Sequence, residues 1–221
     1  MENDEFITVQ GISKSELVIK KSKFIGLLKS VNTEQEAFDF LRLVKTEYPD
    51  ATHHCFAFSI GSGARKISRS NDDGEPLNSA GKPILSAIES SDLNNVICVV
   101  IRYFGGIKLG VGGLIRAYGQ TAKECIQKAE RVVNISSTDL HIQTSYKYIG
   151  AVMNLVNRLK GKVISIKQGE DVLAVINIRN SMISVLKEQL KSIGVDLIHP
   201  QFFTHRKNTP DNSKSYMKLI N

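Results

Sequence analysis

A cluster of glycines and cations lies between two strongly patterned segments of the sequence, within the stretch from Asn95 to Tyr118. Glycine lets a backbone approach a partner closely, and a helix that begins on glycines presents N–H groups suited to an anion. Arginine binds phosphate through paired hydrogen bonds, and lysine binds it as a point charge. We therefore predict an anion-binding loop made of Gly105, Gly106, Gly112 and Gly113 with Arg102, Lys108 and Arg116. The alternatives are that the glycines serve strand–helix packing alone and that the cations neutralise nearby carboxylates.

Two aromatic residues, Tyr103 and Phe104, precede the glycines directly. Side chains alternate along a strand, so we expect one of the two to face the core and the other to be free. A free aromatic ring beside cations is suited to stacking on nucleic-acid bases. We include Tyr103 in the candidate binding site.

Carboxylates and histidines supply the remaining candidate chemistry. Asp72, Asp73 and Glu75 lie in a turn-rich segment, and aspartates in turns commonly hydrogen-bond their own backbone. We expect His53, Asp73 and Glu75 to line a cleft beside the glycine loop. His53 and His54 adjoin Cys55, but neighbouring strand residues point to opposite faces and do not share one metal ion. We expect no metal, no cofactor and no catalytic residue.

These residues must be positioned by the elements around them. Residues 96–101 form an apolar run typical of a buried strand, and residues 114–133 carry apolar side chains at helical spacing. Upstream, Thr33 and Glu36 form a capping box that predicts a helix ended by Pro49. The remaining predicted elements of this half are strands within 15–31, at 54–60 and at 66–70, and a short helix at 83–90.

After about Asn134 the pattern predicts a second, smaller domain. Its elements follow the order strand 139–145, helix 147–160, strands 163–167 and 172–178, helix 181–193, strand 195–199. This βαββαβ order is typical of a ferredoxin-like fold. We predict an α+β protein with an N-terminal domain at 1–136, a ferredoxin-like basic domain at 137–203 and a polar tail at 204–221.

The charge of the chain is unevenly distributed. Residues 1–136 hold 17 Lys+Arg and 16 Asp+Glu, whereas residues 137–221 hold 12 and 6, so most of the net +7 lies in the last part. A basic surface of this kind favours a polyanionic partner such as RNA, although it also serves solubility.

Other features of the sequence indicate a cytoplasmic protein without a membrane partner. No run approaches the roughly 18 apolar residues that span a bilayer, and the first residues, MENDEFITV, lack a secretory pattern. The three cysteines, Cys55, Cys98 and Cys125, show no paired spacing and favour a reducing compartment.

Two long motifs make the sequence similar to a known family. The segments NDDGEPLNSAGKPIL and NVICVVIRYFGGIKLGVGGLIRAY, with the stretch Ala51–Ala57, resemble the IMPACT family over nearly the whole chain. The resemblance implies an N-terminal domain with the fold of ribosomal protein S5 domain 2 and a ferredoxin-like second domain. Such a pair looks like the last domains of elongation factor G. It also implies a link to translation, because eukaryotic members are connected with translational control.

Together these features predict a protein that binds RNA or the ribosome and has a translation-associated regulatory role. One alternative is an enzyme acting on a phosphorylated or peptide-like small molecule, with Asp73 or Glu75 as the acid or base. Another is a protein-interaction module that competes with a translation factor. The sequence does not indicate an oligomeric state.

Overall fold

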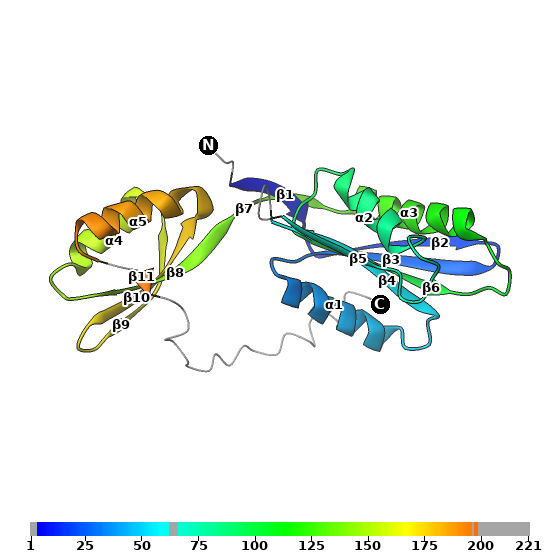
Figure 1. Ribbon diagram of the computed structural model, residues 1–221, viewed down its shortest axis with the longest axis horizontal. Helices are drawn as coiled ribbons and strands as arrows, with labels where there is room; N and C mark the ends of the chain where they lie inside the picture. The colour runs from blue at the N-terminus through cyan, green and yellow to red at the C-terminus, as the bar shows by residue number, and fades with distance from the viewer. Residues whose placement is uncertain (1–3, 62–65, 196, 199–221) are drawn as a thin grey trace. The chain divides into compact units, whose positions relative to one another are not determined.

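The computed structural model describes residues 4–61, 66–195 and 197–198. Its contacts divide the chain into two compact units (Figure 1). Ile7–Val133 form what we call the N-terminal unit, and the C-terminal unit starts at Asn134 and also includes Asp4–Phe6. The boundary falls within β1 (Glu5–Val9) and β7 (Arg131–Ile135), which form a two-stranded sheet.

A five-stranded antiparallel sheet organises the N-terminal unit, in the order β2-β3-β6-β4-β5. Its central strand β6 is the apolar run that the sequence predicts, and seven of its eight residues are buried. A strand buried on both faces reads as a continuous apolar run because every side chain meets a covered face. The strands are β2 (Ile12–Ile19), β3 (Ser22–Ser30), β4 (His53–Ile60), β5 (Ile67–Asn71) and β6 (Val96–Tyr103).

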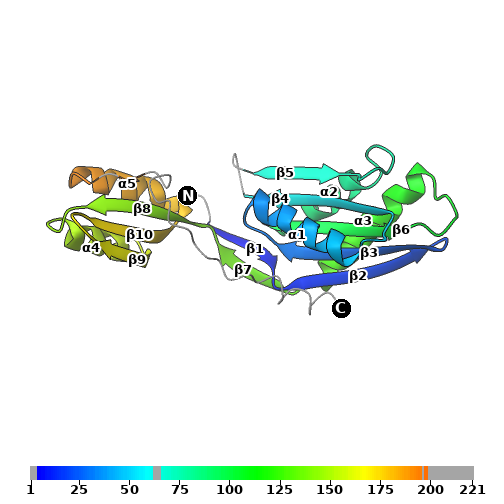
Figure 2. The same cartoon turned by 90° about the horizontal axis from the view of Figure 1, so that it is seen from below.

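Helices cover both faces of this sheet and create two separate cores. Helices α2 (Gly81–Glu89) and α3 (Val111–Lys128) pack on one face, and α1 (Glu34–Glu47) packs on the other (Figure 1). Figure 2 shows the sheet from the side that α1 covers. The predicted Thr33 cap forms, since the Glu36 N–H donates to Thr33 Oγ1 at 3.1 Å, while the Glu36 carboxylate accepts from the Asn32 N–H at 2.8 Å instead of the Thr33 N–H of a full capping box.

The C-terminal unit has the predicted βαββαβ order. Its sheet runs β11-β8-β10-β9, and alternate residues of β10 from Val172 to Ile178 are buried. Helices α4 and α5 contribute five more buried apolar residues to its core: Val152, Leu155, Val156, Leu186 and Leu190. The elements are β8 (Ser137–Thr144), α4 (Ile149–Arg158), β9 (Lys162–Gln168), β10 (Val172–Arg179), α5 (Ile183–Ser192) and β11 (Leu197–Ile198). The predicted tail at 204–221 lies outside the described residues.

The structure agrees with an α+β fold of two units. Among the helices of the described residues, none is both long enough and apolar enough to cross a membrane.

Candidate functional site

The candidate residues gather at one end of the five-stranded sheet. Strand β4 begins at His53 where β6 is about to end, and the register pairs His53 with Arg102. On the other side of β6, Arg102 pairs with Phe24, close to the β2–β3 turn. The acidic turn after β5, the glycine loop after β6 and the β2–β3 turn therefore lie at the same end of the N-terminal unit.

Arg102 is a buried cation rather than a surface one. Its residue is 5 % exposed, and its Nη1 donates to Glu75 Oε1 at 2.5 Å. Its Nη2 donates to Ser22 Oγ at 3.4 Å, and its buried Nε has no hydrogen-bond partner among the described residues. The sequence left two roles open for Arg102, phosphate binding and neutralisation of a carboxylate, and its contacts match the second.

Glu75 is the centre of this buried network. Its Oε1 accepts a hydrogen bond from the Tyr118 hydroxyl at 2.7 Å and lies 3.9 Å from His53 Nε2. The His53 ring is held in turn by Nδ1, 2.8 Å from the Asp73 carbonyl oxygen. The structure therefore brings together three residues that the sequence placed in one cleft: His53, Asp73 and Glu75.

Asp73 is held in its charged form. Burial opposes ionisation, but the His54 N–H at 2.7 Å and Lys45 Nζ at 3.1 Å outweigh it and lower the pKa of Asp73. A carboxylate with a lowered pKa is a poor proton donor or acceptor at neutral pH.

Asp72 has a local structural role. Its carboxylate accepts hydrogen bonds from three backbone N–H groups, of Asn78, Ala80 and Gly81, at 2.8 to 2.9 Å. These bonds close the turn and satisfy donors at the start of α2, as expected for an aspartate at a helix N-terminus. Within the described residues, no group of three or more His, Cys, Asp or Glu side chains is arranged to hold a metal ion.

The buried thiol and phenol beside Glu75 stay protonated. Burial raises the pKa of Cys55 to about 12, and Cys55 Sγ donates to the Asp72 carbonyl oxygen at 3.0 Å. Burial likewise raises the pKa of Tyr118. Because the thiolate is the reactive form of cysteine, Cys55 is not an activated nucleophile.

Gly105 is required by close packing. A Cβ at this position would lie 2.0 Å from the carbonyl carbon of Lys21, in the β2–β3 turn. The Gly105 N–H also donates to Ser22 Oγ at 3.2 Å. Gly105 is therefore needed for the packing of the loop against the β2–β3 turn, independently of any ligand that the loop binds.

The other glycines have different roles. Gly106 and Gly110 adopt positive φ angles of 83° and 72°, which favour glycine, and Gly110 is the N-cap of α3. A Cβ added at Gly112 would lie in open space, 4.0 Å from Arg116 Nη1, whereas a Cβ on Gly113 would lie 2.9 Å from Leu109 Cβ. Gly110 lies outside the predicted set of glycines, although it continues the same glycine-rich run.

The two aromatics lie on different sides of the sheet. Tyr103 packs against the α1 core, where its hydroxyl donates to Asp50 Oδ1 at 3.2 Å. Burial and the Asp50 carboxylate raise the pKa of Tyr103. Phe104 is 47 % exposed, and its ring lies over the Arg102 guanidinium at 5.4 Å. Phe104 is thus the free ring, and Tyr103 is placed away from the Arg102 face.

Several cations at this end of the sheet face solvent. They include the predicted Lys108 and Arg116, together with Lys20 and Lys21, which lie outside the predicted set. Lys20 and Lys21 form the β2–β3 turn, with positive φ angles of 46° and 65°. Among the described residues, none of the four forms an ion pair.

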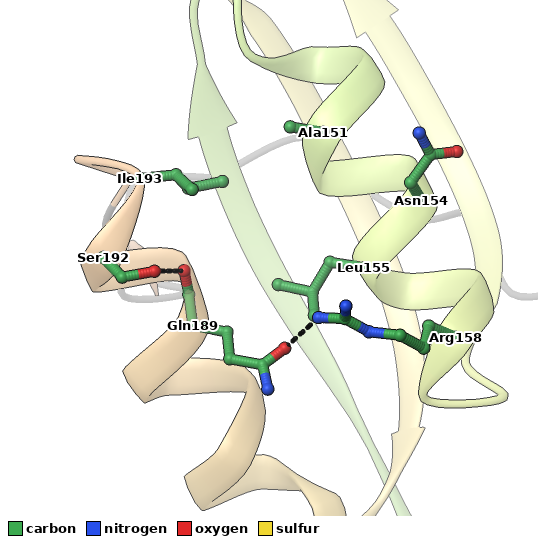
Figure 3. A pocket seen from close by; sticks show the side chains of 7 residues that line it. All are labelled: Ala151, Asn154, Leu155, Arg158, Gln189, Ser192 and Ile193. Atoms are coloured by element: carbon green, nitrogen blue, oxygen red, sulfur yellow. Dashed lines mark hydrogen bonds between the residues drawn. The ribbon is translucent and has the colours of Figure 1, made fainter.

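The structure also has a hollow beside Arg116 and another in the C-terminal unit. A groove of about 480 Å³ between α2 and α3 is lined in part by Arg116 and Lys123. In the C-terminal unit, a hollow of about 430 Å³ lies between α4 and α5, where Arg158 donates a hydrogen bond to Gln189 (Figure 3). No candidate residue lines this second hollow, which holds Ala151, Asn154, Leu155, Arg158, Gln189, Ser192 and Ile193.

Comparisons with known proteins agree on one relationship. Residues 20–126 match the family model described as the Impact N-terminal domain. The chain is 39 % identical over 167 residues to the IMPACT family member YvyE of Bacillus subtilis (strain 168), covering 76 % of each chain. It is 36 % identical over 149 residues to the IMPACT family member YigZ of Escherichia coli (strain K12), covering 66 % of this chain and 72 % of YigZ. A solved structure described as a hypothetical protein matches with a TM-score of 0.67 and 27 % identity, covering 89 % of this chain and 98 % of the other.

Proposed function

The chain belongs to the IMPACT family, and from this premise we propose that it binds RNA, most directly on the ribosome, in a translation-associated regulatory role. The link to translation comes from the family resemblance. The proposal that RNA is the ligand rests on the chain's own charges and on the surface beside the glycine loop.

The observation that carries the proposal is the set of unpaired cations around that loop. Lys20, Lys21, Lys108 and Arg116 are exposed and lack ion pairs within the described residues. The carboxylates of the nearby acidic turn are already satisfied by backbone N–H groups, by Lys45 and by Arg102. The solvent-facing charge near the loop is therefore positive, which suits a phosphate backbone.

The remaining basic charge widens the proposed footprint. Residues 137–198 hold 8 Lys+Arg and 5 Asp+Glu, and residues 199–221 hold 4 and 1. Each segment thus carries a balance of +3. We propose that both add phosphate contacts to those of the loop.

The contacts of the acidic residues favour binding over catalysis. The Glu75 carboxylate is committed to hydrogen bonds from Arg102 and Tyr118, and the lowered pKa of Asp73 makes it a poor acid or base at neutral pH. The alternative of a protein-interaction module is supported by Ile107 and Val111, which are exposed beside Lys108.

The test uses the full chain to capture partners from a lysate, with and without nuclease, followed by ribosome binding at several salt concentrations. We expect nuclease to release the partners and the affinity to fall steeply with salt. The double variant Lys108→Ala with Arg116→Ala should make the dependence of log K on log salt less steep, by the contribution of about two phosphate contacts. Capture that survives nuclease, with no salt dependence, would favour the protein-interaction module instead.

A further inference from the structure

Large apolar side chains that face solvent gather along the glycine loop. Phe104, Ile107 and Val111 are 47 %, 44 % and 52 % exposed, and they fall within eight consecutive positions. Soluble proteins seldom leave such side chains exposed together unless the surface binds something. A phosphate-binding site does not by itself need them.

Phe104 is held in place by the residues beneath it. Its ring lies 5.4 Å from the Arg102 guanidinium, which also lies 5.5 Å from the ring of buried Phe24. Its backbone N–H donates to Thr52 Oγ1 at 3.1 Å. The exposed part of the ring is therefore presented to solvent by an ordered support, which lowers the entropy lost when a ligand binds.

Two lysines lie against the same loop. The backbone of Lys21 contacts Gly105 so closely that a Cβ there would overlap it, and Lys20 precedes it in the turn. Both lysines are exposed, so the turn adds two positive charges next to the residue that follows Phe104.

We infer that the ligand of this surface is a single-stranded RNA segment, with a base stacked on Phe104 and the flanking phosphates bound by Lys20, Lys21 and Lys108. The inference rests on the proposed function and specifies its substrate class. An RNA duplex hides its bases and displays phosphates and ribose, so it leaves the exposed aromatic and aliphatic side chains without a partner. A single strand offers base faces together with phosphates, and aromatic rings beside cations recognise that combination.

The first experiment measures binding of labelled RNA by fluorescence anisotropy. The full chain is titrated with a single strand of about 12 nucleotides, a length within the usual range for such sites, and with a duplex of the same length. We expect the parent to bind the single strand more tightly. Phe104→Ala should weaken single-strand binding about tenfold and leave duplex binding unchanged.

Two further variants separate stacking from folding. Phe104→Trp keeps an aromatic ring and should retain single-strand affinity. Phe104→Leu keeps apolar packing over Arg102, so it should melt close to the parent yet bind single strands as weakly as Phe104→Ala.

The lysines are tested with a variant that preserves the turn. Lys20→Asn with Lys21→Gly removes two charges while supplying the residues that turns with two positive φ angles prefer. The salt slope for single-stranded RNA should fall by about 1.4, since each phosphate contact contributes about 0.7. The matched control, Lys66→Gln with Lys128→Gln, removes the same charge just before β5 and at the far end of α3, and should leave the slope unchanged.

The outcomes distinguish the inference from the proposed function. If the parent binds neither form of RNA, both fail. If the parent binds RNA but prefers the duplex, or if the Phe104 and lysine variants bind like the parent, the single-strand inference is wrong and the proposed function stands. If a protein from the lysate binds the parent but not Phe104→Ala, and RNA does not compete, the surface is a protein site and the inference is wrong.

Discussion

Arg102 and Glu75 form a buried ion pair on which the site depends. Their side chains are 6 % and 4 % exposed, so each charge relies on the other for compensation. Removing one partner of a buried pair leaves an uncompensated charge, which costs about 3–5 kcal/mol. We therefore expect Arg102→Met to lower the stability of the N-terminal unit by about that amount, as measured by urea unfolding.

The double variant Arg102→Met with Glu75→Gln is the control for this prediction. It removes both charges and should recover part of the loss. If Arg102→Met alone unfolds at the same urea concentration as the parent, the pair does not stabilise the fold.

Asp73 predicts a pH dependence of stability. The pKa of Asp73 in the folded protein is lower than in the unfolded chain, where an aspartate has its reference pKa of about 3.9. A lowered pKa contributes stability that is present above the unfolded pKa and is lost as the pH falls through the folded pKa. The melting temperature of the parent should exceed that of Asp73→Asn at pH 6, and the difference should shrink below about pH 4.

Thermal melts of the parent, Asp73→Asn and Lys45→Gln across this pH range check the prediction. Lys45→Gln removes one cause of the lowered pKa and should show a smaller pH dependence than the parent. An equal difference between the parent and Asp73→Asn at pH 3 and pH 6 would contradict it.

The loop after β6 and the turn between β2 and β3 form one packed assembly. Gly105 lets the two backbones meet, while Gly112, seven positions later, faces open space in the first turn of α3. We expect Gly105→Ala to destabilise the N-terminal unit by about 3 kcal/mol, because its Cβ would overlap the Lys21 backbone.

Gly112→Ala is the matched substitution, and it should raise the stability of the N-terminal unit instead of lowering it. Alanine is favoured over glycine inside a helix by about 0.5–1 kcal/mol, and nothing obstructs its methyl group here. Circular dichroism melts of both variants give the comparison. A Gly105→Ala protein that melts like Gly112→Ala would show that the loop and turn can move apart without cost.

The chain enters the C-terminal unit twice, once at each end of the N-terminal unit. Asp4 is 9 % exposed, and its carboxylate accepts hydrogen bonds from the Ser181 N–H at 2.9 Å and the Ser181 hydroxyl at 2.5 Å. Its carbonyl oxygen accepts one from the Ser136 N–H at 2.7 Å. The C-terminal unit is therefore held by residues from distant parts of the sequence, which differs from the contiguous domain predicted at 137–203.

This arrangement predicts a local effect of Asp4→Ala. The Ser181 N–H lies in the turn that leads into α5. Because the variant removes the carboxylate that accepts from this N–H, amide hydrogen exchange along α5 should become faster. Exchange in β6 should stay at the parent's rate. The control Asp39→Ala, on the solvent-facing side of α1, should change neither. Equal exchange rates along α5 in Asp4→Ala and in the parent would mean that the N-terminal residues do not stabilise this unit.

The sequence by itself determined the family and most of the elements in their order. It missed the two-stranded sheet of β1 and β7 and extended the helix after the glycine loop to residue 133, whereas α3 ends at Lys128 and residues 131–135 form β7. Apolar periodicity, the Thr33 cap and the terminating Pro49 act within a few residues, so local patterns were sufficient to predict α1, β6 and the βαββαβ order. The glycine-rich loop and the two long motifs were equally visible, because their residues are consecutive in the chain.

Only the tertiary structure decided which charges face solvent. Arg102 reads as a surface cation until the fold brings Glu75 and Ser22 to it, 27 and 80 positions away. Lys20 and Lys21 look like ordinary hairpin residues until Gly105 packs against their turn from 84 positions along the chain. Burial and ion pairing depend on such distant partners, and local sequence carries no signal for them.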